Sequence, residues 1–124
     1  MLTKLLKSKL HRATVTQTDL NYHGSITIDR DLLDTSGLLP NEAVLVADCE
    51  NGNRFETYII AGARGTGVIG INGAAARLSR TGNRVIIMSF LYAGPATIMG
   101  HQSKTIICDE NNRVAETIII PTVE

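Results

Sequence analysis

The chain has 124 residues, with twelve basic and twelve acidic side chains and a formal net charge of zero. This length predicts one domain, residues 1–124, with a sizeable core. The charge balance argues against nucleic acid or an anionic membrane as a partner, and no apolar run is long enough to span a membrane. Cys49 and Cys108 are the only cysteines. Without a Cys/His cluster at metal-ligand spacing, they argue against a metal site or a disulfide framework and favour a reducing cytoplasm.

The opening segment, residues 1–15, is basic and lacks acidic side chains. Transit peptides share this composition, but the segment has neither an apolar h-region nor a small-residue cleavage site. We therefore expect a solvated basic edge that leads into the first strand.

Runs of β-branched residues dominate the remaining chain and predict a mainly β fold. Several runs, such as VIIMSF, are continuously apolar, which is typical of strands buried on both faces or curled into a small barrel. The expected strands cover residues 13–18, 25–29, 43–48, 54–60, 85–90, 104–108 and 114–120.

Helical signals are short. Residues 29–34 have an acidic start and are followed by Gly37 as a stop, and residues 73–78 allow little more than one turn. Residues 110–112 read as a hairpin turn. The segments LDTSGLLPNEAVLV and LSRTGNRVIIM each run from a short helix through a glycine into a buried strand. This internal similarity suits a barrel built from two related ψ-shaped motifs, although the order helix, glycine, strand is common.

Residues 65–70 match the pattern G-x-G-x-x-G after a strand-like run. A dinucleotide site also needs a helix that opens at these glycines and an acidic residue after the next strand. That strand ends in Leu91 and Tyr92 without a carboxylate. We therefore expect no nucleotide cofactor.

The small residues Asn72, Gly73, Ala74 and Ala75 leave their backbone N–H groups uncovered. If they open a short helix, these donors could hold a carboxylate. A tight turn packed with small residues is the simpler interpretation of this stretch alone.

Gly24-Ser25 is a common turn pair, but it is also a peptide bond that a serine can break. The Ser25 hydroxyl can attack the Gly24 carbonyl and form an ester, and glycine leaves the approach open. A threonine hydroxyl could stabilise the oxyanion that develops. β-Elimination and hydrolysis then leave a pyruvoyl group, an electrophile that can form a Schiff base with an amine and draw electrons from its α-carbon.

Such an enzyme needs a cation for a substrate carboxylate and a proton donor for the decarboxylated carbon. Arg54 and Tyr58 supply these groups and face the same side of one predicted strand. Thr57 faces the other side of a regular strand, so a bulge or a subunit interface is needed for it to contribute. Singly, each residue has an ordinary role: Arg54 as a surface arginine, Tyr58 as a core-edge aromatic and Lys9 as a solvated lysine.

Five segments occur in the order KLHRATVT, YHGS, NGNRFETYII, INGAAARL and GNRVIIMSF. In this combination, and over essentially its whole length, the chain resembles the pyruvoyl-dependent aspartate α-decarboxylase family. The resemblance implies a lyase in which Ser25 becomes the pyruvoyl group and Gly24 ends the released N-terminal chain. Ser25 would then form the Schiff base with L-aspartate, and β-alanine and CO2 would be the products, for pantothenate and coenzyme A synthesis.

The resemblance also implies a fold, an assembly and roles for individual residues. The fold would be a double-psi β-barrel with short helices, assembled as a cytoplasmic homotetramer with sites between subunits, and some relatives need a maturation factor. This sequence departs from many relatives by carrying His23, rather than an acid, before the glycine. The implied roles are proton donation by Tyr58, substrate contact and polarisation of the Gly24 carbonyl by Thr57, carboxylate binding by Arg54 and Lys9, substrate binding by the backbone of Gly73, Ala74 and Ala75, and support of the site by Asn72.

Two other functions are open to the sequence. A non-catalytic small β-barrel that binds protein or nucleic acid would predict a basic or aromatic surface cluster, but the chain has two phenylalanines, three tyrosines and no net charge. A pyruvoyl enzyme for another amino acid is the second. Lys9 and Arg54 as two cations favour a dicarboxylate, and a comparison of aspartate with glutamate would separate these substrates.

Overall fold

The computed structural model describes all residues, 1–124, and confirms the mainly β fold. Its nine strands form one sheet in the order β2-β6-β3-β5-β4-β7-β1-β8-β9. The elements are β1 (Thr3–Thr14), β2 (Gln17–Asp19), β3 (Ser25–Asp29), α1 (Arg30–Ser36), β4 (Ala43–Asp48), β5 (Arg54–Gly62), β6 (Ile69–Asn72), the 3-10 turn η1 (Gly73–Arg77), β7 (Arg84–Ala93), α2 (Pro95–Gly100), β8 (Gln102–Cys108) and β9 (Val114–Pro121).

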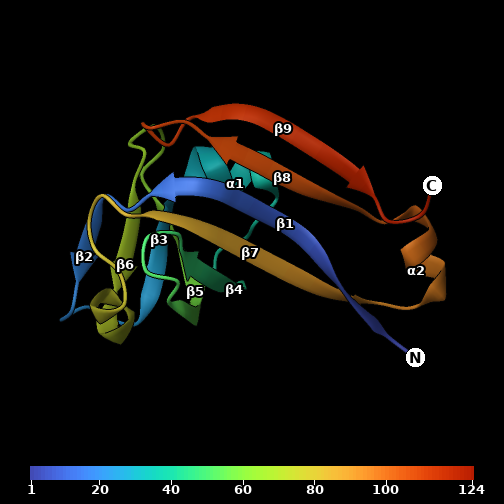
Figure 1. The fold of residues 1–124 in the computed structure, drawn as a ribbon, viewed down its shortest axis with the longest axis horizontal. Helices are drawn as coiled ribbons and strands as arrows, with labels where there is room; N and C mark the ends of the chain where they lie inside the picture. Colours follow the sequence, from blue (N-terminus) through green and yellow to red (C-terminus); the bar gives the residue numbers. More distant parts are fainter.

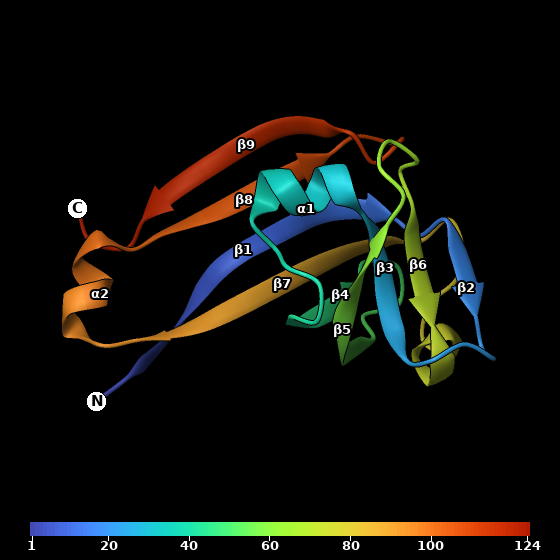
Figure 2. The same cartoon turned by 180° about the vertical axis from the view of Figure 1, so that it is seen from behind.

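The strands divide into a body and an arm (Figure 1). β2 to β6 and η1 gather at one end of the molecule, and the long strands β1, β7, β8 and β9 run from there to α2, where both chain termini lie. The view from behind shows α1 packed across β1 and β8 on one face of the sheet (Figure 2).

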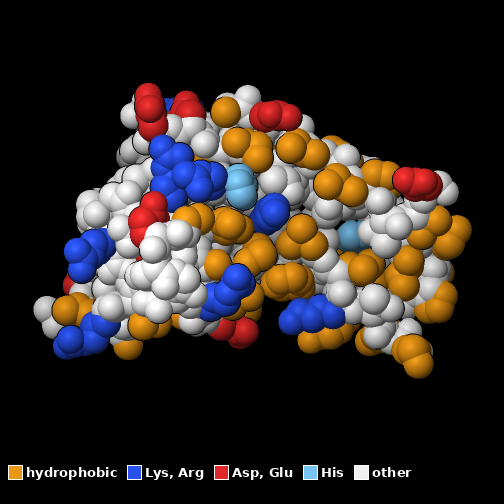
Figure 3. All heavy atoms as spheres, viewed as in Figure 1, with side chains coloured by type: hydrophobic (Ala, Val, Ile, Leu, Met, Phe, Trp, Pro, Cys, Tyr) orange, Lys and Arg blue, Asp and Glu red, His pale blue; other side chains and the backbone are white.

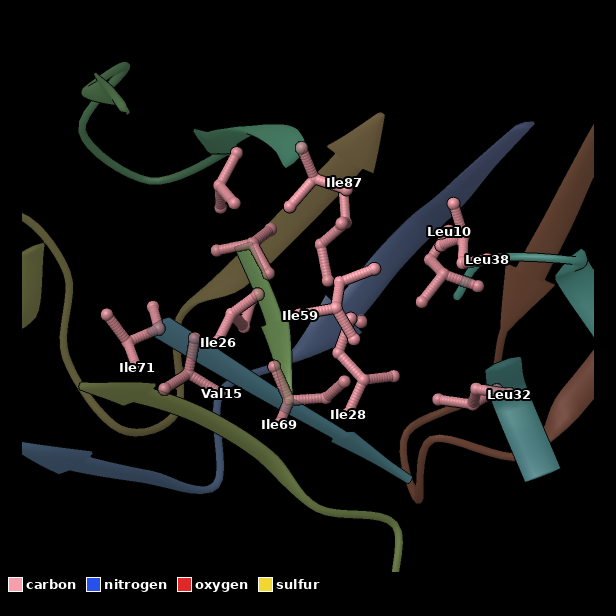
Figure 4. Packing of buried hydrophobic residues seen from close by; sticks show 14 of the residues in the cluster. Leu10, Val15, Ile26, Ile28, Leu32, Leu38, Ile59, Ile69, Ile71 and Ile87 are labelled. Atoms are coloured by element: carbon pink, nitrogen blue, oxygen red, sulfur yellow. The ribbon is translucent and has the colours of Figure 1, made fainter. Parts of the chain in front are cut away.

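The core explains why β3 presents Ser25 where it does. Ile26 pairs with Ile59 of β5 on one side and with Ile71 of β6 on the other, and all three side chains are fully buried. They lie in the cluster of apolar side chains in Figure 4. Because successive side chains in a strand point to opposite faces, Ser25 and Thr27 point away from this cluster.

The opening segment differs from its prediction. Instead of a solvated edge it forms β1, the longest strand, which pairs with β7 on one side and β8 on the other. The predicted strand 13–18 is wrong, because β1 ends at Thr14 and a separate short strand, β2, pairs with β6. Lysine-rich sequence reads as solvent-exposed, but hydrogen bonding along both edges overrides that preference.

The glycine-rich segment also differs from a dinucleotide motif in its geometry. Gly65 and Gly67 open no helix; their N–H groups donate to the buried Asp29 carboxylate at 3.1 and 2.7 Å. Burial would raise the pKa of Asp29, but its hydrogen bonds from backbone N–H groups and the nearby charge of Arg113 outweigh burial and lower it. The segment therefore binds a carboxylate of its own chain and leads into β6, a strand that the sequence did not predict.

Other short features follow the sequence more closely. α1 begins after Asp29, which caps it, and ends at the left-handed Gly37, as predicted. Residues 110–112 do form the turn between β8 and β9. Of the two similar segments, only the first begins in an α-helix, at the end of α1, although both lead through a left-handed glycine into strands, β4 and β7, that pair with each other.

The buried Asp48 carboxylate gives a prediction about acid stability. It accepts hydrogen bonds from Ser79 Oγ at 2.6 Å, from Asn83 Nδ2 at 2.9 Å and from the backbone N–H groups of Glu50 and Asn51. Burial would raise the pKa of Asp48, but these bonds outweigh it, so the pKa lies below the ordinary value of 3.8. Ionised Asp48 therefore stabilises the fold above that value, and its contribution is lost as the pH falls through the folded-state pKa.

We expect Asp48→Asn to lower the free energy of unfolding at pH 7 by about 1–3 kcal/mol, since an amide cannot accept all four hydrogen bonds. Urea unfolding between about pH 3 and pH 7 measures this loss, and the variant should show a shallower decline in stability below the ordinary pKa of 3.8. Glu116→Gln, at an exposed position of β9, is the control and should change neither quantity. Equal effects of the two substitutions would contradict a role for the buried carboxylate.

Candidate active site

Ser25 sits where an exposed loop enters the buried sheet. Residues 21–24 are exposed, whereas Ser25, the first residue of β3, has no exposed surface. Its Oγ donates to the His23 carbonyl at 3.0 Å and accepts from Asn72 Nδ2 at 3.0 Å. The hydroxyl is thus fixed from both sides, next to the peptide bond that it would have to attack.

Asn72 is placed by strand pairing. It lies opposite Ser25 across the antiparallel pair β3–β6, is almost fully buried, and donates a second hydrogen bond to Thr27 Oγ1 at 3.1 Å. The Asn72 side chain therefore does not cap η1, which begins at the next residue. These two hydrogen bonds define how Asn72 supports the site. The sequence did not suggest that Thr27 contacts Asn72, although Thr27 lies two residues after Ser25 and therefore on the same face of β3.

Tyr58 lies beside Ser25. β3 and β5 are parallel, and Ile26 lies opposite Ile59. The residues one position earlier, Ser25 and Tyr58, therefore also lie opposite each other. Their backbones are separated by one strand spacing, about 4.8 Å, and their side chains point to the same face of the sheet. Tyr58 is 38% exposed.

Contacts at the start of β4 fix the position of Tyr58 on β5. The Glu42 carbonyl accepts a hydrogen bond from Ile59 N–H at 3.1 Å, and Ala43 pairs with Tyr58. The Glu42 carboxylate is bound by Lys7 Nζ at 3.0 Å and by the Ser89 hydroxyl. Burial would raise the pKa of Glu42, but its bonds to Ser89, Lys7 and the Leu39 N–H outweigh burial and lower it. A charged carboxylate therefore anchors the segment next to Tyr58.

Exposure alternates regularly along β5, with Arg54 and Tyr58 on the outward face and Thr57 turned the other way, opposite Val44. Arg54 lies four residues before Tyr58, so their backbones are about 13 Å apart. The Arg54 guanidinium forms no ion pair or hydrogen bond within the chain, and neither does the Thr57 hydroxyl. β5 contains no bulge that would turn Thr57 toward Ser25.

Lys9 lies four strands away from Ser25 along the sheet of one chain. It pairs with Met88 of β7, which pairs with Leu45 of β4 and, through it, with Glu56 of β5. Paired residues share a face, so Lys9 is on the same face as Tyr58, but β1 is four strand spacings from β3, about 19 Å along the sheet. The Lys9 ammonium has no ion-pair partner in the chain.

His11 follows Lys9 on this face of β1. Burial lowers the pKa of His11, and the charges of Lys9 and Arg12 lower it further. Its Nδ1 is buried without a hydrogen-bond partner. The imidazole is therefore neutral at pH 7, which leaves Lys9 and Arg12 as the cations of this stretch.

η1 adjoins the Gly24-Ser25 bond from the other side. Gly73 is buried against Gly24, whereas Ala74 is exposed and Ala75 partly buried. Of the predicted site residues, the structure thus gathers Gly24, Ser25, Asn72, Gly73 and Tyr58. No hydrogen bond or ion pair joins the side chains of Lys9, Arg54 or Thr57 to that group within one chain.

Two further observations concern metal binding and membrane spans. No group of three or more His, Cys, Asp or Glu side chains is placed to hold a metal ion. No helix is long and apolar enough to cross a membrane.

A serine buried directly after an exposed glycine, with its hydroxyl held from both sides, places a side chain of the nucleophile type next to a backbone carbonyl in a small β protein. Sequence comparison identifies the family. Residues 1–115 match the family model described as aspartate decarboxylase. The chain belongs to this family.

Curated relatives agree over nearly the whole length. The chain is 51% identical over 118 residues to a protein of Neisseria meningitidis serogroup C, covering 95% of this chain and 93% of that one. It is 50% identical to proteins of Caldicellulosiruptor saccharolyticus, covering 94% and 91% of the two chains, and of Geobacillus sp., covering 96% and 94%. All three are named aspartate 1-decarboxylase.

Proposed function

We propose that this chain, a carboxy-lyase, converts L-aspartate to β-alanine and CO2 for pantothenate and hence coenzyme A synthesis, and that it does so with a pyruvoyl group made from Ser25. The decarboxylation follows from the family and from relatives about half identical over nearly the full chain. The observation that carries the pyruvoyl proposal is the buried Ser25 hydroxyl, held between the His23 carbonyl and the Asn72 amide.

The self-processing reaction uses residues of this chain and one water molecule. Ser25 Oγ attacks the Gly24 carbonyl carbon, the C–N bond breaks, and the hydroxyl proton ends on the Ser25 nitrogen, which gives an ester. Removal of the Ser25 α-proton then expels the Gly24 carboxylate and leaves dehydroalanine. Hydrolysis adds water and releases ammonia, so that a ketone heads the new chain. Throughout the first step Asn72 donates a hydrogen bond to Ser25 Oγ and keeps this oxygen beside the Gly24-Ser25 bond.

The surroundings of Ser25 fit a pyruvoyl group. The position heads a fully paired strand, lies out of solvent, and has glycine before it and glycine beside it. When formed, the group supplies an electrophilic carbonyl that takes up the substrate amine and draws electrons from its α-carbon. Asn72, which donates to Ser25 Oγ, would hold it.

The remaining residues have roles on the substrate. The phenol of Tyr58, whose backbone lies one strand spacing from that of Ser25, donates the proton that replaces the lost carboxylate. The Arg54 guanidinium and the Lys9 ammonium, both unpaired within the chain, bind the carboxylates of L-aspartate, and the backbone of Gly73, Ala74 and Ala75 binds the substrate beside them. Thr57 contacts the substrate and polarises the Gly24 carbonyl during cleavage.

We further propose a homotetramer of double-psi β-barrels with active sites between subunits. The four strand spacings along the sheet between β1 and β3, and the lack of any ion pair between Lys9 and this chain, support an assembly in which Lys9 reaches a site across an interface. Apolar side chains also gather on the face of β1, β7 and β8 and along the arm (Figure 3), where Tyr92 and Ile120 are 69% and 55% exposed. Patches of this kind mark interfaces. The two free cysteines are compatible with a cytoplasmic location, and a maturation factor would act on the exposed loop before Ser25.

An intact mass spectrum of the purified, denatured protein tests the proposal. We expect two chains, residues 1–24 and residues 25–124, the second lighter by one ammonia than a chain headed by serine. The same sample should release CO2 from L-aspartate and not from L-glutamate. Activity from a protein that is entirely uncut would contradict the pyruvoyl proposal, and a preference for glutamate would contradict the substrate.

A further inference from the structure

Gly73, the first residue of η1, lies against the backbone of Gly24, just before the Gly24-Ser25 bond. It has a left-handed φ of 76° and is buried. A Cβ on Gly73 would lie 2.7 Å from Gly24 Cα, 2.9 Å from Gly24 N and 3.3 Å from the Tyr22 carbonyl oxygen. The first two separations are shorter than real Cβ atoms adopt, so position 73 has room only for a hydrogen atom.

We infer that Gly73 is a positioning residue for self-cleavage: its missing side chain lets Gly24 lie against η1, and this contact holds the Gly24 carbonyl in reach of the Ser25 hydroxyl. The inference rests on the proposed cleavage at Gly24-Ser25. It assigns Gly73 a task before any substrate binds, in addition to the substrate contact proposed for its backbone.

The atoms in contact show why a side chain here would act on the scissile bond. At Gly70 an added Cβ would meet the Gln17 side chain, which can move aside. At Gly73 it would meet backbone atoms of Gly24, which can move only by shifting the peptide itself. A methyl group at position 73 would therefore displace Gly24.

Ser25 would not follow this displacement. Its backbone is paired with Asn72 in β3–β6 and its hydroxyl is bound by the Asn72 amide, so Ser25 and Asn72 form one rigid unit. Moving Gly24 while Ser25 stays fixed changes the distance between nucleophile and carbonyl. A misplacement of about 1 Å can cost roughly 100-fold in rate.

The glycines of this chain provide matched controls. Gly52 has the same φ of 76°, and a Cβ there would meet nothing within 4 Å, so Gly52→Ala carries only the conformational penalty. Gly67 has φ 70°, and a Cβ there would lie 2.8 Å from the Asn111 carbonyl oxygen, so Gly67→Ala carries the penalty and a backbone clash away from Ser25. Gly73→Asn separates the two causes at the site, because asparagine tolerates the left-handed region but still has a Cβ.

The experiment follows cleavage of each full-length variant over time by intact mass spectrometry. We expect Gly73→Ala and Gly73→Asn to cleave about 10- to 100-fold more slowly than the unsubstituted chain. Gly52→Ala should cleave at the normal rate, and Gly67→Ala close to it. Thermal unfolding of the same substitutions, each combined with Ser25→Ala so that every sample is one uncut chain, measures their cost to stability separately.

Other results would contradict either the role of Gly73 or the proposed function. Normal cleavage of Gly73→Ala, or recovery in Gly73→Asn, would overturn the contact with Gly24. Equal slowing in Gly67→Ala and Gly73→Ala, or failure of Gly73→Ala alone to fold in the Ser25→Ala background, would assign the effect to stability and overturn positioning. Absence of cleavage in the unsubstituted chain would instead reject the proposed function.

Discussion

Replacing Ser25 with alanine is expected to leave a single uncut chain of 124 residues and to abolish decarboxylation of L-aspartate. The substitution removes the hydroxyl that we propose attacks the Gly24 carbonyl, and with it the proposed source of the pyruvoyl group. The fold should persist, because alanine occupies the space of the buried serine and the backbone pairing of β3 with β5 and β6 needs no hydroxyl. Intact mass and CO2 release measure the two losses.

Thr27→Ala is the matched control for this substitution. It removes a second hydroxyl from the same face of β3, one that is bound by the same Asn72 amide at a similar distance, 3.1 Å. This variant should be cut into two chains and should retain activity. A Ser25→Ala protein that is still cut between positions 24 and 25 would show that another group attacks the bond.

The strands around the site could be predicted from local sequence. The bounds expected for β3 and β4, residues 25–29 and 43–48, agree with the structure because β-branched runs there end at turns and caps. The face shared by Arg54 and Tyr58 follows from the two-residue period of a strand. Local pattern was misleading where neighbours override it: β1 is rich in lysine, and β6 lies within a glycine motif.

The contacts of the site depend on pairing between distant segments. The bond from Asn72 to Ser25 joins residues 47 positions apart and requires the antiparallel register of β3 and β6. The position of Tyr58 opposite Ser25 requires the parallel register of β3 and β5. Neither register can be derived from one strand alone. The chemistry of the residues suggested roles for Ser25 and Tyr58 and the family resemblance suggested one for Asn72, whereas their geometry came from the structure.

Lys9 and Thr57 illustrate a different limit. The sequence allowed Thr57 to contribute only through a bulge or an interface, and β5 has no bulge. Lys9 is four strand spacings from Ser25. Both residues therefore depend on the proposed assembly for their roles, Thr57 in polarising the Gly24 carbonyl as well as in contacting substrate, whereas Gly24, Ser25 and Asn72 already lie together within one chain.

Tyr58→Phe should separate cleavage from catalysis. The variant keeps the ring on β5 but loses the phenol, so we expect normal processing at Ser25 and a kcat for aspartate decarboxylation about 100- to 10,000-fold lower, as for loss of a general acid. Stability should change little, since the side chain is 38% exposed and its hydroxyl has no hydrogen-bond partner in the chain. Intact mass, steady-state kinetics and thermal unfolding measure the three quantities.

Tyr92→Phe is the control for the loss of a phenol. Tyr92 is 69% exposed on β7, opposite Lys4 near the start of β1, and has no proposed contact with substrate. Its substitution should leave kcat unchanged. If Tyr58→Phe were fully cleaved and equally active, the proton would have to come from another donor or from water. The position of Tyr58 opposite Ser25 would then reflect strand pairing alone. If the Tyr58→Phe chain stayed uncut, the phenol would act in processing, because the ring that packs on β5 is unchanged and only the hydroxyl is missing.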